Sequence, residues 1–346
     1  MNRPLELDAL TTARTHFPAL ERWTYMDVAG RGVLSRAARA ALDAHLDERM
    51  MNGGDKAKFF ELVETTRARF AELIHAAPEE IALTKNISEG LNMVATAFDW
   101  KRGDNVVLCP ELEHPNNVYP WLNMQRYGLE VRTVAARNGH IPVEDMIARM
   151  DAGTRVATVS TVTFAPGFRT DVDTLGRACR ERGVMLLVDA AQSAGIIDTD
   201  VERSCIDALA VSTQKGLLAL YGMGFFYCRR DWAERLKPAY LARFGVDLGD
   251  AHEATLGGLS FRYAPGARRF DLGNYNYAAC AAVSASMQQL LAWGTANIER
   301  HVTDLAHTLA RGFIDSGLTV SGVPPGPHLA NIVTVGELSA DHYATG

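Results

Sequence analysis

The chain has 346 residues, of which 47% are hydrophobic and 22% charged, a composition that excludes collagen-like, mucin-like and largely disordered proteins. Its length allows one large domain with an appendage or two domains, and either can bury a substantial core. The 35 Lys and Arg residues against 41 Asp and Glu give a net charge of −6, with no basic run long enough to follow a nucleic acid. We therefore expect no nucleic-acid partner.

The cysteine content and the absence of long apolar runs indicate the cellular compartment in which we expect the protein. The five cysteines are an odd number, widely spaced and without a CxxC pair, so neither a disulfide framework nor a zinc site is predicted. No apolar run approaches the ~20 residues of a membrane-spanning helix. The start, MNRPLELDAL, has acidic residues where a signal peptide has a long apolar stretch. We expect a cytoplasmic protein with no metal and no membrane partner.

Two amphipathic helices, 36–51 and 56–76, come first, separated by Asn52, Gly53 and Gly54. From about residue 81 to 228, short β-branched or apolar runs then alternate with helical patterns, which is typical of a sheet with crossover helices. The predicted strands are 106–109, 129–134, 155–160, 184–188, 208–212 and 224–228. The predicted helices between them are 116–127, 143–150 and 171–182, the last ending before a C-cap glycine.

The last third of the chain is more irregular. A stretch from 245 to 276 is rich in glycine and proline and carries a basic patch, and helices are predicted over 277–293 and 296–315. The tail offers only a proline-rich link and a short strand over 332–335, so we expect the last domain to be cut short. The predicted division is an N-terminal arm (1–30), a large domain (31–275), and a linking helix with a partial small domain (276–346).

The run VMLLVDAAQ is an apolar strand that ends in Asp189. Open α/β sheets bind ligands beyond the carboxyl ends of their strands, although an aspartate there can equally cap a turn or helix. The next strand ends in STQKG, which places Lys215 just past its end. A lysine desolvated in a crowded loop can act as a nucleophile, whereas most lysines are solvated surface charges. Together the two supply what pyridoxal phosphate (PLP) requires: a carboxylate for the pyridine nitrogen and an amine for the aldehyde.

Two further segments can contribute to such a site. In TKNISEGLN, Ile87 and Ser88 open a helix whose positive end would face a phosphate, although Ser followed by Glu is equally an ordinary capped helix start. The segment ELEHPNNVYPW follows a strand and places His114 on the same rim, where an imidazole can lie flat on a pyridine ring or shuttle protons. A lone histidine usually does neither.

Taken together and in order, these motifs resemble the class V aminotransferase family of fold-type I PLP-dependent enzymes, which contains cysteine desulfurases, selenocysteine lyases, isopenicillin N epimerase and kynureninase. The resemblance runs from YMDVAGRG at Tyr25, which is similar to the family's YLDNAA opening, to about Leu291. It implies an α/β fold of the PLP-dependent transferase fold type I: a large domain with a mostly parallel central sheet flanked by helices, and a small α+β C-terminal domain.

The resemblance also implies roles for individual residues. Lys215 matches the lysine that forms the internal aldimine with pyridoxal 5′-phosphate, and Asp189 matches the partner of the pyridine nitrogen. Gln192 matches the group bonded to the phenolic oxygen, and His114 the histidine that stacks on the ring. The residues implied for the phosphate are Ile87, Ser88, Ser212 and Gln214. Asn274, in FDLGNYN, matches a residue that completes the phosphate site of a neighbouring subunit, which implies a homodimer with shared active sites.

Several departures from the family pattern bear on the reaction. Gln214 stands where many members have histidine, and Phe164 where desulfurases have asparagine and other branches tryptophan. No cysteine follows Cys280 to serve as the sulfur-abstracting thiol of a desulfurase. The arginine that clamps the substrate carboxylate is also unassigned. Four arginines could replace it, although each can equally be a surface or structural residue: Arg169, Arg262, Arg268 and Arg269.

These motifs support three interpretations. The first is a PLP-dependent enzyme acting on an amino acid or amine, most simply a class V aminotransferase, in which Lys215 is the general base and Asp189 keeps the pyridine protonated. The second keeps the cofactor but ends in β-elimination, carbon–sulfur cleavage or epimerisation. The third, a non-catalytic scaffold, predicts erosion of the lysine or the aspartate, and both are present. A nucleotide-binding Rossmann protein is excluded, because no GxGxxG follows the first strand.

Overall fold

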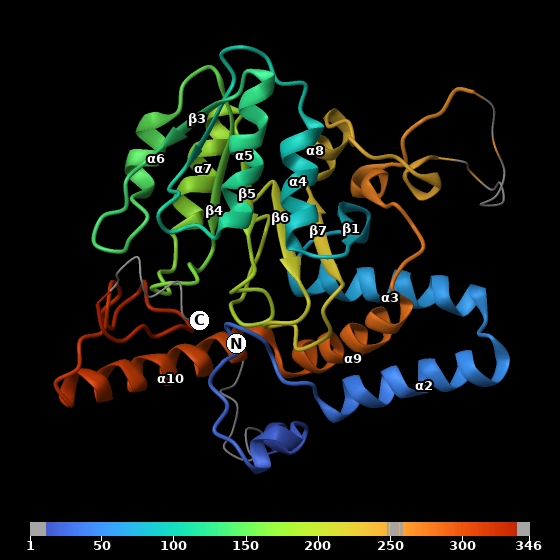
Figure 1. Ribbon diagram of the computed structural model, residues 1–346, viewed down its shortest axis with the longest axis horizontal. Coiled ribbons are helices and arrows are strands. Elements are labelled where there is room, and N and C mark those ends of the chain that lie inside the picture. Colours follow the sequence, from blue (N-terminus) through green and yellow to red (C-terminus); the bar gives the residue numbers. More distant parts are fainter. Residues whose placement is uncertain (1–11, 248, 250–255, 257–258, 338–346) are drawn as a thin grey trace.

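A seven-stranded sheet organises the computed structural model, which describes residues 12–247, 249, 256 and 259–337 (Figure 1). The strands are β1 (Ile81–Thr84), β2 (Asn105–Leu108), β3 (Glu130–Thr133), β4 (Thr154–Ser160), β5 (Met185–Asp189), β6 (Ala208–Ser212) and β7 (Gly224–Cys228). Their order across the sheet is β1-β7-β6-β5-β4-β2-β3. The pairs from β6 to β3 are parallel, whereas β7 is antiparallel to β6 and β1. The mostly parallel sheet is therefore confirmed.

The helices predicted over 36–51, 56–76, 143–150, 171–182, 277–293 and 296–315 are all present, with limits within three residues of those predicted. The α-helices described are α2 (Arg36–Asn52), α3 (Lys56–Leu73), α4 (Ile87–Ala97), α5 (Tyr119–Met124), α6 (Val143–Arg149), α7 (Val172–Arg182), α8 (Arg230–Arg235), α9 (Tyr277–Trp293) and α10 (Thr295–Asp315). Ser35 caps α2 and Asp171 caps α7, each accepting a backbone N–H of the first turn. Gly183 ends α7 at a φ of 67°, a conformation that glycine adopts without strain. Among the helices described, none is long and apolar enough to cross a bilayer.

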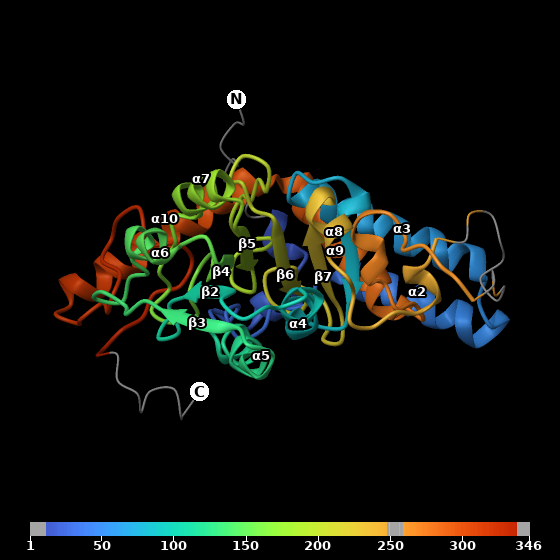
Figure 2. The same ribbon diagram turned by 90° about the horizontal axis from the view of Figure 1, so that it is seen from above.

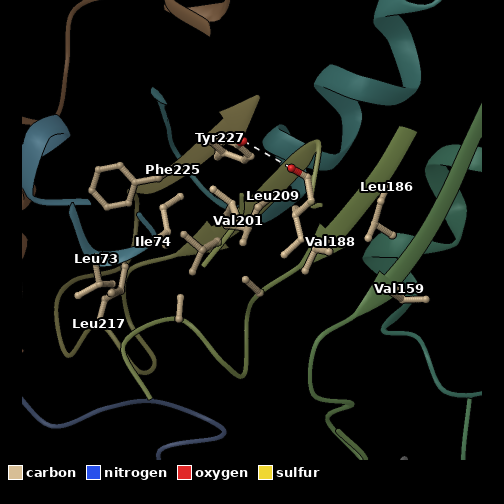
Figure 3. Packing of buried hydrophobic residues seen from close by; sticks show 14 of the residues in the cluster. Leu73, Ile74, Val159, Leu186, Val188, Val201, Leu209, Leu217, Phe225 and Tyr227 are labelled. Atoms are coloured by element: carbon tan, nitrogen blue, oxygen red, sulfur yellow. Dashed lines mark hydrogen bonds between the residues drawn. The ribbon is translucent and has the colours of Figure 1, made fainter. Parts of the chain in front are cut away.

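Helices cover both faces of the sheet because successive side chains of a buried strand point to opposite sides. In β5, Leu186 and Val188 pack with α3, α6, α7 and α9, while Met185 and Leu187 pack with α4, α5 and α8. Figure 2 shows α7 and α5 on opposite sides of the sheet. Figure 3 shows part of the first cluster, where the buried Tyr227 hydroxyl donates to a backbone carbonyl at 3.4 Å. The core is thus two apolar layers separated by the sheet.

Two elements of the central region differ from expectation. β1 is a strand that the pattern does not single out, because it has only four residues and pairs only with β7, the last strand of the chain. The single helix predicted over 116–127 is wrong: a 3-10 turn (Pro115–Asn117), α5 and a second 3-10 turn (Gln125–Tyr127) replace it. Pro120 has no N–H to donate to the turn before it, so a continuous helix cannot form there.

The strand predicted over 332–335 is also wrong. Only Val335 pairs, in one isolated bridge with Val320. The backbone bonds of the segment go to residues 319–321 around this bridge, and Thr334 donates its hydroxyl to the Pro166 carbonyl at 3.3 Å, so the pairing is too short to make a strand. Residues 1–11 of the predicted N-terminal arm (1–30) and residues 338–346 of the predicted partial small domain (276–346) lie outside the described residues.

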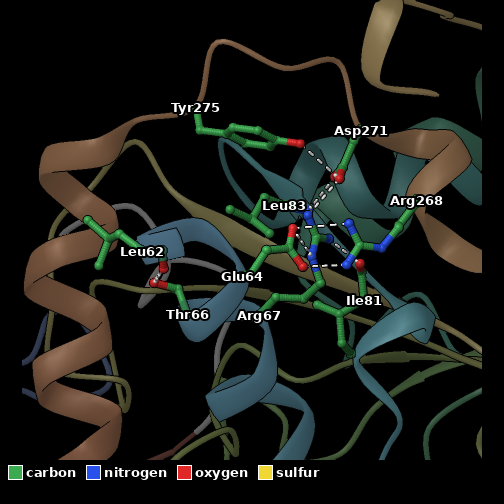
Figure 4. A network of polar contacts seen from close by, with 9 residues as sticks. All are labelled: Leu62, Glu64, Thr66, Arg67, Ile81, Leu83, Arg268, Asp271 and Tyr275. Atoms are coloured by element: carbon green, nitrogen blue, oxygen red, sulfur yellow. Dashed lines mark hydrogen bonds and ion pairs between the residues drawn. The ribbon is translucent and has the colours of Figure 1, made fainter. Parts of the chain in front are cut away.

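A buried ionic network joins α3, β1 and the segment before α9 (Figure 4). Arg67 is fully buried, and its guanidinium bonds to the Asp271 carboxylate at 2.7 Å and to the Ile81 carbonyl. Asp271 also accepts the Leu83 N–H at 2.9 Å and the Tyr275 hydroxyl at 3.1 Å. A charge is tolerated in the interior only when it is paired and hydrogen-bonded. This network therefore fixes the edge of the sheet to the chain that leads into α9.

Candidate active site

The carboxyl ends of β4, β5 and β6 form the rim of a hollow of about 210 Å³. Ser160 and Asp189, the last residues of β4 and β5, are partners in the parallel ladder, and Ser212 ends β6 beside them. All the predicted site residues except Ser88 and Asn274 line the hollow. The other lining residues are Asn116, Ser160, Val162, Phe164 and Ala191. Residues from five separate segments of the chain therefore meet at one edge of the sheet.

Asp189 is the buried carboxylate of the hollow. It is 3% exposed, and its Oδ1 accepts the Ala191 N–H at 2.9 Å. Burial raises the pKa of Asp189 to about 6, while this hydrogen bond and the charge of Lys215 act in the opposite direction. An anion that is shielded from water in this way favours a cationic partner, such as a protonated ring nitrogen.

Lys215 follows β6 in a loop of the same rim. Burial lowers the pKa of its amine, while the negative charges of Asp189 and Asp27 act in the opposite direction. The N-terminal arm holds the loop in place, since the Gly32 N–H donates to the Gln214 carbonyl at 2.7 Å. A Cβ at position 32 would lie too close to the carbonyl oxygen of Lys215, so this approach requires glycine. The arm thus fixes the backbone that carries the amine.

His114 lies across the hollow at the start of a 3-10 turn. Its Nδ1 accepts the Asn116 N–H at 3.1 Å, which assigns the proton of the neutral ring to Nε2. Burial and the charge of Lys215 lower the pKa of His114, so the ring is neutral at neutral pH. Its centroid lies 5.6 Å from that of Phe164, with an interplanar angle of 71°. A neutral imidazole and a phenyl ring therefore supply the aromatic part of the lining.

Gln192 brings an incompletely bonded amide to the hollow. Its Nε2 donates to the carbonyl of Ala29 in the arm at 3.0 Å, and its Oε1 is buried without a hydrogen-bond partner in the described part of the chain. The backbone carbonyl of Gln192 accepts the Asn331 side-chain amide at 3.0 Å, which fixes the main chain there. Because buried polar groups are normally satisfied, the unpaired Oε1 leaves a hydrogen-bond acceptor available at the hollow.

The start of α4 also lines the hollow, through Ile87. The Ile87 N–H donates to Ser212 Oγ at 2.8 Å, which leaves the hydroxyl proton of Ser212 to donate into the hollow beside Gln214. The N-terminus of α4 adds the positive end of its dipole. Ser88 lines a separate hollow of about 470 Å³, so the structure does not bring it to this rim.

Asn274 is likewise not brought to the rim within one chain. It is exposed, has a φ of 49°, and lines a third hollow of about 240 Å³ beside Gly222 and Met223. Asparagine is among the residues that tolerate this conformation best. The assignment implied by the resemblance places Asn274 in the site of a neighbouring subunit, and the position of the side chain on the surface is compatible with it.

Glu113 is a buried acid of the site that the sequence reasoning missed. Its carboxylate accepts the backbone N–H and the hydroxyl of Ser160 and the side-chain amide of Asn117, each at 2.7 Å. Burial and the negative charge of Asp189 raise the pKa of Glu113 to about 7. The available signal was its place directly before His114, after a buried strand. Glu113 joins the loop that carries His114 to the end of β4.

None of the four arginines proposed for the substrate carboxylate lines the hollow. Each is held by a partner elsewhere: Arg169 by Glu299 at 2.6 Å, Arg262 by Asp247 at 3.2 Å, Arg268 by Glu64, and Arg269 over the ring of Tyr263 at 5.4 Å. These contacts are structural. They hold the four guanidinium groups away from the rim of the hollow.

The raised pKa of Asp189 makes the stability of the cofactor-free protein depend on pH. The contribution of this carboxyl to stability is full below about pH 4 and is lost as the pH rises through about 6, because the folded protein retains a proton that the unfolded chain releases. We expect Asp189→Asn to be more stable than the unaltered protein at about pH 8, by on the order of 2–3 kcal/mol, and by only about 1 kcal/mol at about pH 4.5.

Urea unfolding at the two pH values measures this difference. Asp47→Asn is the matched control, because Asp47 is exposed on α2 and should show no comparable change with pH. If Asp189→Asn were no more stable at the higher pH, ionisation of the buried carboxyl would carry no cost and its described environment would be wrong.

A family model for "Aminotransferase class-V" matches residues 48–343 of the chain. A "Probable cysteine desulfurase" of Methanothermobacter thermautotrophicus is 32% identical over 297 residues, covering 83% of this chain and 72% of the relative. An uncharacterized aminotransferase of Bacillus subtilis is 28% identical over 320 residues, covering 90% of this chain and 82% of the relative. The matches therefore include relatives described as desulfurases and relatives described as aminotransferases.

Two solved structures of the enzyme C-DES share the fold. One is a mutant with glycine covalently linked to the PLP cofactor, with a TM-score of 0.85, 24% identity, and coverage of 96% of this chain and 88% of that chain. The other is the cystine C–S lyase in complex with its reaction product cysteine persulfide, with a TM-score of 0.83, 25% identity, and coverage of 92% and 85%. Motifs, fold and family match agree: the chain belongs to the class V aminotransferase family, whose cofactor is pyridoxal 5′-phosphate.

Proposed function

We propose that this chain is an aminotransferase that acts on an amino acid or amine bound in the hollow of about 210 Å³. The supporting observation is the placement of Asp189 and Lys215 at the ends of the neighbouring strands β5 and β6. A buried carboxylate and a desolvated amine that share one hollow are the pair that PLP chemistry requires.

The residues of the hollow fit PLP group by group. Asp189 would accept a hydrogen bond from the protonated ring nitrogen, Lys215 would hold the aldehyde carbon, and the neutral His114 would lie against the ring face. The side-chain NH2 of Gln192, which has a second N–H beyond the one bonded to Ala29, would donate to the phenolic oxygen. The phosphate would be bound by Ser212, Gln214 and the start of α4 at Ile87. The hydrogen-bond donors and the acceptor of the hollow thus correspond to the polar groups of PLP.

When bound, PLP supplies an electron sink that acidifies the α-carbon of the amino substrate. Asp189 keeps a proton on the ring nitrogen, because the buried carboxylate is stabilised by a cationic partner. Lys215 would act as the base at the α-carbon, because its lowered pKa increases the fraction of neutral amine at neutral pH. His114, which lines the hollow, would shield one face of the ring from water. In transfer, the donor leaves as a keto acid and an acceptor keto acid receives the amino group.

A carbon–sulfur lyase is the second candidate, supported by the likeness to the desulfurase and to the cystine lyase. It shares the removal of the α-proton and differs in expelling a sulfur group from the β-carbon. Within the described residues, no cysteine lines the hollow. Elimination needs no thiol from the protein, so it is the form of sulfur chemistry that this site favours. Epimerisation would use the same early steps.

The functional unit that we propose is a homodimer in the cytoplasm. Asn274 is exposed beside Leu272 and would complete the phosphate site of a second copy of the chain. All five cysteines are free thiols, which supports a reducing compartment.

Loading the purified protein with PLP and following its visible spectrum tests the proposal. We expect a yellow protein whose visible band is bleached by borohydride, because a lysine-bound imine is a conjugated chromophore. Incubation with a panel of amino acids, with assays for keto acid, sulfide and ammonia, should give keto acid that depends on an added acceptor. Sulfide or ammonia without an acceptor would instead identify a lyase. A colourless protein that takes up no PLP would contradict both candidates.

A further inference from the structure

Glu113 is buried beside the hollow and reaches it only through its neighbours. It is 3% exposed and is not among the residues that line the hollow, whereas His114, the next residue, lines it. The carboxyl group is therefore in the protein interior, and the imidazole is at the rim of the hollow. A side chain in this position can act on a ligand only by fixing the residues that contact the ligand.

Three hydrogen-bond donors converge on the Glu113 carboxyl group. Its Oε1 accepts the Ser160 backbone N–H at 2.7 Å, and its Oε2 accepts the Ser160 hydroxyl and the Asn117 side-chain amide at the same distance. The orientation of the Asn117 amide is fixed, because its Oδ1 accepts the Thr158 hydroxyl at 2.9 Å and the Trp121 indole N–H at 3.4 Å. The NH2 group of Asn117 must therefore face Glu113.

This set of donors fits a carboxyl group and does not fit an amide. Glu113→Gln would put an NH2 group in place of one carboxyl oxygen. In place of Oε1 it would face the Ser160 N–H, and in place of Oε2 it would face the Asn117 amide. Either orientation sets two donors against each other in a buried place, which weakens the connection that the carboxyl group makes.

The donors to Glu113 belong to the elements that hold His114. Asn117 also donates its backbone N–H to the His114 carbonyl at 2.8 Å, which closes the turn that begins at His114. Within this turn the Asn116 N–H donates to His114 Nδ1 at 3.1 Å. Ser160 is the last residue of β4. The carboxyl group thus ties the turn to the end of a buried strand, and the turn determines where the ring lies and which nitrogen carries its proton.

We propose that Glu113 is a positioning residue for His114: through Ser160 and Asn117 it holds the imidazole in one place and one tautomer for contact with the cofactor. This inference rests on the proposed function, because that function places His114 against the PLP ring. An imidazole that is ordered in advance binds the ring without a further loss of side-chain entropy. Without the carboxyl group, the turn loses its connection to β4 and the ring should sample several positions.

The imidazole signals of cofactor-free protein labelled with 15N-histidine test the first part of the inference. Because Nδ1 accepts the Asn116 N–H, His114 should show a single tautomer with its proton on Nε2 at about pH 8. Its signals are assigned by their absence from His114→Ala. In Glu113→Gln we expect signals averaged over two tautomers. Ser160→Ala removes one donor and should give a smaller change of the same kind, so the test remains decisive if Glu113→Gln does not fold.

Titration of the cofactor-free protein with PLP, followed through the visible band, tests the second part. We expect Glu113→Gln to raise the apparent Kd for PLP about 5- to 50-fold, because part of the binding free energy is then used to order the imidazole. The same substitution added to His114→Ala should change the Kd by less than about twofold, since the residue through which Glu113 acts is already absent.

Asp207→Asn is the matched control. Asp207 is 1% exposed and accepts the Leu186 N–H at 3.0 Å, but it precedes β6 and so lies at the opposite edge of the sheet from the hollow. This variant should change neither the His114 signals nor the affinity for PLP, even where it unfolds at a lower urea concentration.

Unaltered His114 signals in Glu113→Gln and Ser160→Ala would overturn the inference. A loss of PLP affinity that is as large in the His114→Ala background as in the unaltered protein would also overturn it, since Glu113 would then act independently of the imidazole. Failure of the unaltered protein to form the visible band with PLP would instead remove the proposed function and the cofactor contact with it, while the tautomer signals would still decide whether Glu113 orients His114.

Discussion

Replacing Lys215 with alanine should lower turnover by three or more orders of magnitude, comparable to the loss of a catalytic nucleophile in other enzymes. The amine is expected both to hold the cofactor and to move the α-proton, and no second lysine among the described residues lines the hollow. The variant should still bind PLP through its phosphate and ring contacts. Its spectrum should be that of the free aldehyde, and borohydride should no longer attach the cofactor to the protein.

Two further activity assays test whether the loss of turnover is specific to the Lys215 amine. Lys58→Ala removes an exposed lysine on α3 that has one weak partner, Glu48 at 3.4 Å, and should retain full activity. Added methylamine should restore part of the activity of Lys215→Ala, because a small amine can occupy the space left in the hollow. Turnover within tenfold of the unaltered enzyme would exclude Lys215 from the proposed role.

Replacing Arg67 with methionine should lower the free energy of unfolding by about 3–5 kcal/mol, the cost of leaving the partner of a buried ion pair uncompensated. Asp271 would keep its bonds to the Leu83 N–H and the Tyr275 hydroxyl but would lose its cation in a site that is 2% exposed. The double variant Arg67→Met with Asp271→Asn should be less destabilised than Arg67→Met alone, since it no longer buries an unpaired charge.

Urea unfolding of PLP-loaded protein at a fixed protein concentration measures both changes. Arg39→Met provides the comparison, because Arg39 forms an ion pair of 2.8 Å with Asp43 on α2 but is 69% exposed. That variant should unfold at nearly the same urea concentration as the unaltered protein. Equal losses at positions 39 and 67 would mean that burial does not determine the strength of the network.

The sheet and much of the site could be predicted because their signals are local. The apolar run that forms β5 ends directly in Asp189, and the run that forms β6 is followed by Lys215, so the sequence itself places both groups at one edge of the sheet. The capping residues of α2 and α7 are also adjacent to the helices that they begin or end. These signals can be recognised without knowing which distant segments of the chain contact one another in the fold.

The features that escaped prediction depend on contacts between distant segments. The role of Glu113 is evident only when Ser160 is known to lie beside it in the fold. The role of Gly32 follows from the closeness of the loop at Lys215, far along the chain. The segment at 332–335 has the composition of a strand, yet it pairs with another segment only through one isolated bridge, between Val335 and Val320. The periodicity of apolar residues describes one segment at a time, so it cannot identify the segment against which that one packs.

The position of β7 between β1 and β6 has a consequence for biosynthesis. β1 leaves the ribosome before the other six strands, but it cannot join the sheet until β7, the last of them, has been made. Until then the nascent chain exposes an unpaired strand and an open edge at β6, both of which can pair with other polypeptides. Messages that end before residue 224 should therefore yield aggregates, and slow translation of the preceding stretch should increase the demand for chaperones.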